Sequence, residues 1–435
     1  MNPHSLIQRF YRPHASSPAR PGDRVAIVDP YSTGRLLAGA FAARGVEAVA
    51  VLTGAPAPGP SGTVSGEEYA AVIDHGQDAA HTARLLERWN VRHVLAGTES
   101  GVPAADLIAH HLGLPGNNPA NSATRRNKFD MSLALATAGL AQAKTGVAFN
   151  VGGARNHAYE YGWPVVVKPV DSGGSDGVVI ARDARQVTAA AAQILTCANL
   201  FGKQNEAVLV QEYLSGEQYA VNTVSRGGLH RLVEVWHDRR TDLGNGKLIY
   251  DRMDLLEPGT WLTRVLFEYV EACLDALGVD WGPAHSEVVL TKAGPVLIET
   301  GARLQGGDSA ELMRRAVGTS QTDAVVQATL DSAAAHAARA RQQYAYSPVT
   351  QIFLQAPAGG RVSAAGIEKL AQIPEVAGFV RPLMLDGAVS QTVDLLSSPG
   401  TLYLTGESTR RIDCAHSAVR ALEAADLYQP AHPAH

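Results

Sequence analysis

Two acidic residues, Glu287 and Glu299, close the two ends of a predicted β-hairpin, and this pair constrains the fold more than any other feature of the sequence. Apolar, β-rich stretches flank residues 291–295, which is typical of a strand–turn–strand unit. Pairing that is symmetric about Ala293 places Glu287 opposite Glu299, and directly opposed Cβ atoms lie roughly 5 Å apart. Like charges at that distance repel each other, so a fold accommodates both carboxylates most simply by placing cations between them. Mg²⁺ is a suitable cation, because it prefers carboxylate oxygens together with phosphates. The alternative is a solvated hairpin edge whose acids face water, and the hairpin alone does not decide between the two.

Length and composition narrow the class of protein. A chain of 435 residues is too long for one core, so two to four domains are expected. A net charge of −5 without a long basic run argues against a nucleic-acid partner. Cys197, Cys273 and Cys414 are widely spaced, which fits a reducing cytoplasm better than a disulfide framework or a thiolate metal site. No stretch approaches the ~18 apolar residues of a membrane span, and no secretion signal opens the chain, so we expect a cytoplasmic protein without a membrane partner.

Strands and helices alternate from residue 23 to residue 112. The predicted strands are 24–29, 48–52, 71–74 and 93–96, and the predicted helices are 35–44, 78–89 and 104–112. This alternation predicts a parallel sheet that binds ligands at the carboxyl ends of its strands. Polar residues that follow two of these strands are therefore candidates, although turn and helix-cap chemistry also explains them: Asp29, Ser32, Thr33, Glu99 and Ser100.

The rest of the chain consists of strands joined by Gly-rich turns and interrupted by helices. Helices are predicted at 122–138, 184–198, 261–277, 323–344 and 417–425, and short strands at 350–354, 378–381 and 402–404. The expected division is an N-terminal arm (1–22), an α/β domain (23–118), a central domain (119–330) with a small lid subdomain (about 145–214), a β-rich portion (331–428) and a disordered tail (429–435).

Two further segments suit a nucleotide. A predicted strand ends at Lys168 and leads into a Gly/Ser-rich loop, 169–177, whose backbone N–H groups are free to approach phosphates. A strand follows this loop, so it is not a P-loop, and an ordinary flexible turn is the alternative. The strand 208–214 runs into an extended linker, 215–219, whose backbone edge offers the carbonyl and N–H that adenine needs, although an ordinary strand and turn would look the same.

Taken in order, these segments resemble the ATP-grasp superfamily over roughly residues 115–310, and residues 23–115 resemble the α/β domain that precedes it. The resemblance implies an ATP-grasp fold with α/β and α+β parts. It implies that Lys128 and Lys168 are nucleotide lysines and that Glu287 and Glu299 are metal carboxylates. It also implies a phosphate-covering loop of Ser172, Gly173, Gly174 and Ser175, and an adenine hinge of Gln211, Glu212, Tyr213 and Leu214.

Within the superfamily, segments 216–225, 249–253, 285–287 and 299–307 are similar to the L-amino acid ligases that make dipeptides, as is the β-rich C-terminal portion. Two positions depart from the pattern. The usual ribose-binding carboxylate is replaced by Gln218, with Glu217 beside it, so either residue is a candidate for the ribose contact. A common metal-binding Asn is replaced by Gly301, so a second Mg²⁺ would rely on phosphate oxygens or water.

The resemblance implies an ATP-dependent carboxylate–amine ligase that forms an acyl phosphate and releases ADP and phosphate. Its cofactors would be ATP and one or two Mg²⁺ ions, with Mn²⁺ as a substitute. Arg303 would stabilise the transferring phosphoryl group and the later oxyanion, helped by N–H groups of Gly306 and Gly307, and its alternative role is a salt bridge to Glu299. His285 shares a strand face with Glu287, so it either packs there or contacts a substrate.

The expected substrates are small molecules, two amino acids or close relatives, and a homodimer is suggested by analogy alone. A cation around residues 238–246, a segment predicted to be mobile, is expected to bind the free carboxyl group of an amino acid. The candidates are His237, Arg239, Arg240, Lys247 and Arg252. Alternative functions are a ligase for a specialised-metabolite acid or amine, a nucleotide-binding regulatory protein without turnover, and carboxylation with bicarbonate.

Overall fold

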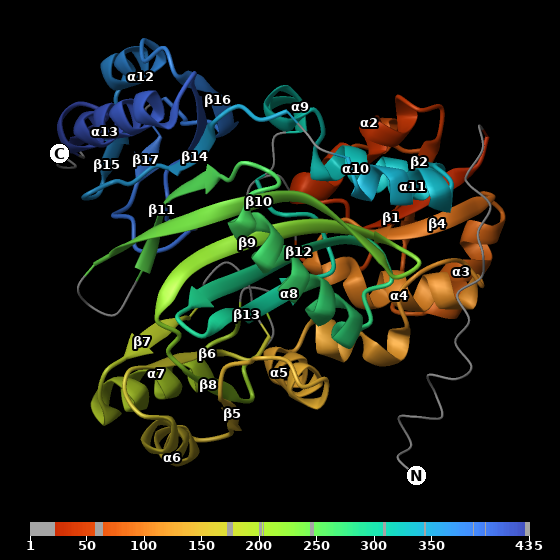
Figure 1. The fold of residues 1–435 in the computed structure, drawn as a ribbon, viewed down its shortest axis with the longest axis horizontal. Helices are drawn as coiled ribbons and strands as arrows, with labels where there is room; N and C mark the ends of the chain where they lie inside the picture. The colour runs from red at the N-terminus through yellow and green to blue at the C-terminus, as the bar shows by residue number, and fades with distance from the viewer. Residues whose placement is uncertain are drawn as a thin grey trace, which may run out of the picture.

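The computed structural model describes residues 22–56, 64–171, 177–199, 202, 204–243, 248–307, 310–342, 345–385, 387–395 and 397–430. Several predictions fall outside these residues: almost all of the arm 1–22, most of the tail 429–435, Lys247, and the loop formed by Ser172, Gly173, Gly174 and Ser175. Figure 1 shows an N-terminal α/β lobe, a large central sheet, a small lobe beneath that sheet and a C-terminal lobe on the side away from the N-terminal one.

The N-terminal lobe contains the predicted parallel sheet, with strand order β3-β2-β1-β4. Its strands are β1 (Arg24–Val28), β2 (Glu47–Leu52), β3 (Ala71–Asp74) and β4 (Val91–Ala96). Its helices are α2 (Leu36–Ala42), α3 (Ala79–Glu87) and α4 (Val102–His111), with 3-10 turns η1 (Ser32–Arg35), η2 (Gly66–Glu68) and η3 (Glu99–Gly101). Apolar side chains on both faces of the sheet are buried, because α2 covers one face and α3 and α4 cover the other.

The central sheet has eight antiparallel strands in the order β13-β12-β9-β10-β11-β14-β18-β16. They are β9 (Gly216–Arg226), β10 (Leu229–Asp242), β11 (Leu248–Leu255), β12 (Trp281–Thr291), β13 (Gly294–Gly301), β14 (Val349–Phe353), β16 (Val376–Arg381) and β18 (Thr401–Thr405). Helix α8 (Trp261–Leu277) buries an apolar stripe against β9 and β12. Three strands from the C-terminal portion therefore continue the central sheet.

The small lobe is a four-stranded antiparallel sheet with order β5-β8-β6-β7, packed against α6 (Val151–Tyr161) and α7 (Ala184–Thr196). Its strands are β5 (Thr145–Ala148), β6 (Val165–Pro169), β7 (Val179–Ala181) and β8 (Val208–Glu212). The remaining elements are η4 (Pro119–Asn121), η5 (Ala123–Arg125), α5 (Lys128–Thr137), α9 (Ala310–Val317), α10 (Gln321–Leu330), α11 (Ala333–Ala340), β15 (Gly360–Val362), α12 (Ala364–Ala371), β17 (Ala388–Val389), α13 (Thr409–Ala425) and β19 (Tyr428–Pro430).

Two predicted helices are interrupted by capping residues. The helix expected at 122–138 begins as one short 3-10 turn, η5, and α5 starts only after Asn127, whose side chain accepts hydrogen bonds from two backbone N–H groups of the first turn. The helix expected at 323–344 is divided into α10 and α11, because Ser332 caps the second helix. Part of the segment expected to be mobile, 238–246, lies in a strand instead, since β10 pairs with β11 through Asp242, with a register shift between Arg239 and Arg240.

None of the helices among the described residues combines the length and the apolar composition needed to cross a bilayer. All three cysteines are free thiols, of which Cys273 is buried.

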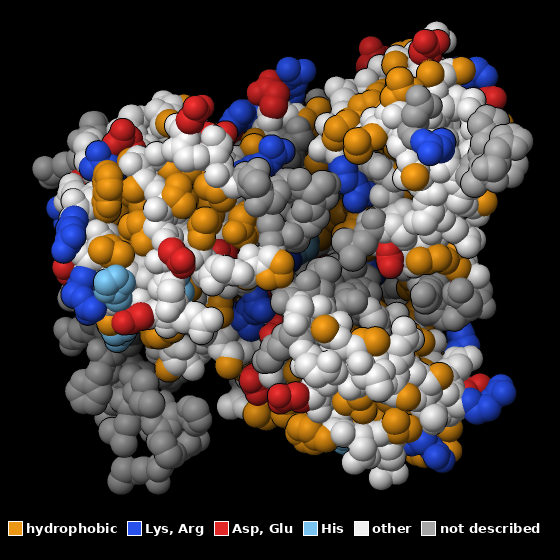
Figure 2. All heavy atoms as spheres, turned by 180° about the vertical axis from the view of Figure 1, so that it is seen from behind, with side chains coloured by type: hydrophobic (Ala, Val, Ile, Leu, Met, Phe, Trp, Pro, Cys, Tyr) orange, Lys and Arg blue, Asp and Glu red, His pale blue; other side chains and the backbone are white. Residues whose placement is uncertain are grey.

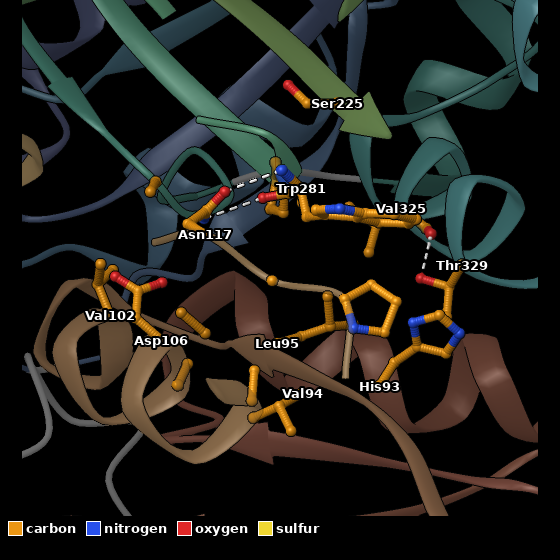
Figure 3. Close-up of a pocket in the computed structure, with 18 of the residues that line it drawn as sticks. His93, Val94, Leu95, Val102, Asp106, Asn117, Ser225, Trp281, Val325 and Thr329 are labelled. Carbon is orange, nitrogen blue, oxygen red and sulfur yellow. Dashed lines mark hydrogen bonds between the residues drawn. The ribbon is translucent and has the colours of Figure 1, made fainter. Parts of the chain in front are cut away.

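A small cavity of about 30 Å³ lies where the N-terminal sheet meets β12 and α10. Figure 3 shows the ring of His93 next to Thr329 and below the indole of Trp281. The His93 and Trp281 ring centroids are 6.3 Å apart, and the guanidinium carbon of Arg226 lies 5.0 Å from the Trp281 ring. Within the described part of the chain, His93 Nε2 has no hydrogen-bond partner. Burial, reinforced by the positive charge of Arg226, lowers the pKa of His93 to about 4.

This buried histidine predicts acid sensitivity. The pKa of His93 falls from 6.5 in the unfolded chain to about 4 in the folded one, so the unfolded state takes up a proton first. The free energy of unfolding should therefore be unaffected by His93 above pH 6.5 and should fall by on the order of 3 kcal/mol as the pH drops from about 6.5 to 4. Urea unfolding across this range should show the loss in the wild type and a shallower dependence in His93→Gln. Identical pH profiles for the two proteins would rule out His93 as the cause.

Candidate active site

Glu287 on β12 lies directly opposite Glu299 on β13, as the hairpin pattern predicts, but a β-bulge produces the alignment. Thr291 pairs with Gly294, and this register would set Glu287 opposite Ile298 if it continued unbroken. One extra residue on β13 shifts the register before Glu287 and brings Glu299 opposite it. Both carboxylates consequently line the same cleft.

That cleft has a volume of about 650 Å³, within the roughly 300–1,000 Å³ typical of small-molecule sites, and lies between the small lobe and the central sheet. Figure 2 shows acidic and basic side chains together in the hollow at the centre of the face opposite to that of Figure 1. Apolar side chains from β6, β7, β12 and β13 line it, including Val166, Ile180, Val289 and Ile298. It brings together ten predicted site residues: Lys128, Lys168, Gln211, Glu212, Tyr213, Leu214, Glu217, Gln218, Glu287 and Glu299.

Each of the two carboxylates already has a polar partner in the cleft. Lys128 Nζ lies 2.8 Å from Glu299 Oε2, and Gln218 Nε2 donates to Glu287 Oε2 at 2.8 Å. Burial opposes the charge on Lys128, but the Glu299 carboxylate outweighs it and raises the pKa of Lys128. Burial likewise opposes ionisation of Glu287, yet its neighbour His285, 3.7 Å away, and the charges of Arg240 and Arg303 hold its pKa at about 2. Glu287 is therefore an anionic oxygen donor at neutral pH.

The donor set fits Mg²⁺ bound together with a phosphate. Among the residues that the structure describes, no three His, Cys, Asp or Glu side chains are grouped to hold a metal, so the protein ligands would be Glu287 and Glu299. Mg²⁺ accepts this set because it usually binds one or two carboxylates and takes its other ligands from phosphate and water. At Gly301, where the sequence resemblance implies a metal-binding Asn in the family, an added Cβ would lie 2.5 Å from Glu99 Oε2 and 3.2 Å from Arg303 Nε. The absence of a side chain at Gly301 thus leaves room for the ion pair between Glu99 and Arg303.

Arg303 forms an ion pair across two domains. Its Nε donates to Glu99 Oε2 at 3.0 Å, so its partner is not Glu299, the alternative suggested by sequence spacing. Glu99 also lies 3.6 Å from Arg126. Glu99 follows β4 at the carboxyl edge of the N-terminal sheet, where the sequence predicts ligand-binding residues.

The other N-terminal candidates have local roles. Both oxygens of the buried Asp29 carboxylate accept hydrogen bonds, from the backbone and hydroxyl of Thr53 and from Ser100 Oγ. Thr33 is buried in η1. Ser32 lies close to Gly306, since a Cβ on Gly306 would come 3.9 Å from Ser32 Oγ. Gly307 has a φ of 73°, which favours glycine, and its carbonyl accepts a hydrogen bond from Tyr403.

His285 is held at the end of a buried polar chain that the sequence analysis did not anticipate. Asn222 Oδ1 lies 2.8 Å from His285 Nδ1, and Asn222 Nδ2 donates to Gln305. The other ring nitrogen, Nε2, lies 3.7 Å from Glu287 Oε1. Side chains alternate between the two faces of β9, so Asn222 lies on the same face as Gln218. This alternation could have identified Asn222 as a site residue from the sequence.

The charge of Lys168 depends on pH near pH 8. Its Nζ donates to Gln211 Oε1 at 3.0 Å. Burial, together with the positive charge of Lys128, lowers the pKa of Lys168 to about 8 against the opposing pull of Glu299 and Glu287. The ammonium group is therefore present below pH 8 and is lost as the pH rises above it.

We predict that ATP affinity weakens as the pH rises above 8. The dissociation constant of ATP should increase by up to about tenfold per pH unit, because Lys168 loses a charge that would attract phosphate, whereas Lys128 keeps its charge. Isothermal titration between pH 7 and 9.5 measures this change. Lys168→Arg should remove most of the dependence, since a guanidinium stays protonated. An equally steep rise in that variant would refute the assignment.

Comparisons with known proteins find relatives of this chain. A family profile described as an ATP-grasp domain matches residues 161–311. Dapdiamide A synthase of Enterobacter agglomerans is 32% identical over 351 residues, which cover 79% of this chain and 81% of that protein.

Two solved structures share the fold. An L-amino acid ligase from Bacillus licheniformis has a TM-score of 0.72 at 17% identity, covering 93% of this chain and 98% of that one. The biotin carboxylase domain of 2-oxoglutarate carboxylase from Hydrogenobacter thermophilus, solved with MgADP, ADP and bicarbonate, has a TM-score of 0.61 at 14% identity, covering 93% of this chain and 90% of that one. The match to the relative of 32% identity, together with the family profile and the shared fold, shows that the chain belongs to the ATP-grasp family of ATP-dependent ligases.

Proposed function

We propose that the protein joins the carboxylate of one amino acid, or a close relative, to the amine of another through an acyl phosphate. The observation that carries this proposal is the pairing of Glu287 with Glu299 in one cleft with Lys128 and Lys168, where the charge of Arg303 also acts on Glu287. The amide-forming role rests on the similarity to dapdiamide A synthase and on the fold shared with an L-amino acid ligase.

In the proposed nucleotide site, Lys128 and Lys168 bind the α- and β-phosphates, and the segment from Gln211 to Leu214 binds adenine. We assign the ribose contact to Glu217, because Gln218 is engaged by Glu287. The Glu217 carboxylate accepts from His237 Nε2 at 2.8 Å, and its side chain remains 67% exposed. Ser172, Gly173, Gly174 and Ser175 remain the predicted phosphate cover.

Glu287 and Glu299 would hold one or two Mg²⁺ ions, which neutralise charge on the phosphates when bound. The terminal phosphoryl group then passes from ATP to a carboxylate oxygen of the acid substrate, and ADP leaves. Arg303 stabilises the transferring group, and with the N–H groups of Gly306 and Gly307 it stabilises the oxyanion that forms when the amine attacks the acyl carbon. The acyl–phosphate bond breaks, phosphate departs, and an amide remains.

His285 is the proposed acceptor of the proton that the attacking ammonium must lose. With Nδ1–H donating to Asn222 Oδ1, the lone pair of Nε2 is directed toward the Glu287 side of the cleft. Asn222 would then act as a positioning residue, since it sets which ring nitrogen is free.

The test is a screen of amino acid pairs with Mg²⁺ and ATP, with phosphate release as the readout and mass spectrometry of the products. Phosphate release that requires both an acid and an amine, with a product mass equal to the sum of the two less water, supports the proposal. Release with only bicarbonate as co-substrate would favour carboxylation, and nucleotide binding without release with any pair would favour a regulatory role. A product from non-amino-acid substrates alone would place the enzyme in specialised metabolism.

A further inference from the structure

Arg240 reaches the proposed metal site from a distant strand. It lies on β10, which is separated from β12 by β9, yet Arg240 Nη2 is 3.7 Å from Glu287 Oε2. Arg240 also lines the cleft that contains Lys128 and Lys168. Its guanidinium is therefore near the place where a nucleotide's terminal phosphate would meet the Glu287 carboxylate.

Asp238 and Tyr250 hold this guanidinium in place. Arg240 Nε and Nη2 donate to Asp238 Oδ2 at 3.0 and 2.7 Å, and Nη2 also lies 3.0 Å from the hydroxyl of Tyr250. The guanidinium carbon stacks over the Tyr250 ring, 4.2 Å from its centroid. The cation is thus oriented before any ligand arrives, which limits the reorganisation that binding would require.

A purely structural ion pair explains this arrangement less well. The Asp238 side chain is 3% exposed, and its Oδ1 has no hydrogen-bond partner among the described residues. Burying a carboxylate with one oxygen unsatisfied costs free energy, so the pair is a poor device for stability alone. It does, however, place a guanidinium, whose planar fork matches phosphate oxygens, at the edge of the cleft.

We propose that Arg240 binds the terminal phosphoryl group of ATP during its transfer, and that Asp238 is the positioning residue that holds Arg240. This inference deepens the proposed function and rests on its nucleotide site. Arg240 would share the charge on the transferring group with Arg303. Among the cations that the sequence suggested for a substrate carboxyl group, Arg240 is thereby assigned to phosphate.

The test compares ADP with the β,γ-imido analogue of ATP, since only the second carries a terminal phosphate. Both are titrated into the full-length protein with Mg²⁺ and without amino acids. Arg240→Gln should lower the analogue-to-ADP affinity ratio by about tenfold or more, because a charge-assisted contact is lost. Arg240→Lys should lower it about threefold, and Asp238→Asn should lower it by a similar factor if orientation matters.

Arg411→Gln is the control. It lies on α13 outside the residues that line the cleft, and its Nε donates to Glu375 Oε1 at 2.9 Å, so the affinity ratio should stay at the wild-type value. A thermal melt of each variant checks folding, and Arg240→Lys carries the test if Arg240→Gln does not fold. An unchanged ratio in the Arg240 variants overturns the proposal. An unchanged ratio with a raised KM for the acid substrate also overturns it and assigns Arg240 to the substrate carboxylate. The nucleotide titration contains no amino acids, so its result can be interpreted even if the substrate screen yields no product.

Discussion

Replacing Arg303 with alanine should lower phosphate release by about a hundredfold or more while ATP affinity changes by less than about threefold. The guanidinium is proposed to act on charge that develops during transfer, and removing one such group typically costs two to three orders of magnitude in rate. ATP binding should be preserved because Arg303 is proposed to act on charge that develops during transfer, whereas Lys128 and Lys168 are the proposed phosphate contacts of the bound nucleotide. Rapid-mixing measurement of phosphate, together with ATP titration, separates the two effects.

The local structure should survive this substitution, since Glu99 keeps Arg126 3.6 Å away. Arg314→Ala is a suitable control: its side chain is half-exposed and pairs with Asp323, and turnover should remain within about twofold of wild type. If Arg303→Ala retains a tenth or more of wild-type turnover, Arg303 is not the group that stabilises the transition state.

Replacing either Glu287 or Glu299 with glutamine should also reduce turnover by about a hundredfold or more and raise the Mg²⁺ concentration needed for half-maximal rate. Glutamine preserves side-chain shape but removes the anionic oxygen, and Glu287 is ionised throughout the neutral range because its pKa is about 2. Chelation of divalent ions should abolish turnover in the wild type. The measurement is phosphate release as a function of Mg²⁺ concentration for each protein.

Glu311→Gln, an exposed glutamate on α9, should retain the wild-type Mg²⁺ curve and serves as the control. Undiminished turnover in chelator would refute the metal site outright. Wild-type Mg²⁺ curves in both variants would instead show that the ion binds elsewhere. Glu299→Gln also removes the ion pair between Glu299 and Lys128, which alters the surroundings of a proposed phosphate contact. ATP titration of that variant is therefore part of the experiment.

The elements of the fold were predictable where the relevant pattern is local. The parallel α/β lobe follows from alternating apolar segments, and α8 follows from its apolar stripe, with a cap at Thr260 and a left-handed glycine after its end. Errors occurred where a single capping residue outweighed helical periodicity, as at Asn127 and Ser332. The opposition of Glu287 and Glu299 was predicted correctly, but the bulge that creates it was not visible in the sequence.

By itself, the sequence determined the order of nucleotide and metal motifs along the chain, because each depends on residue types at short spacing. Only the tertiary structure decided which distant residues complete the site: Glu99 with Arg303, Asn222 with His285, and Arg240 with Glu287. Those contacts depend on the order of strands in the central sheet and on how the N-terminal lobe packs against it. Both are set by the burial of apolar surface between segments far apart in the chain, which no local pattern encodes.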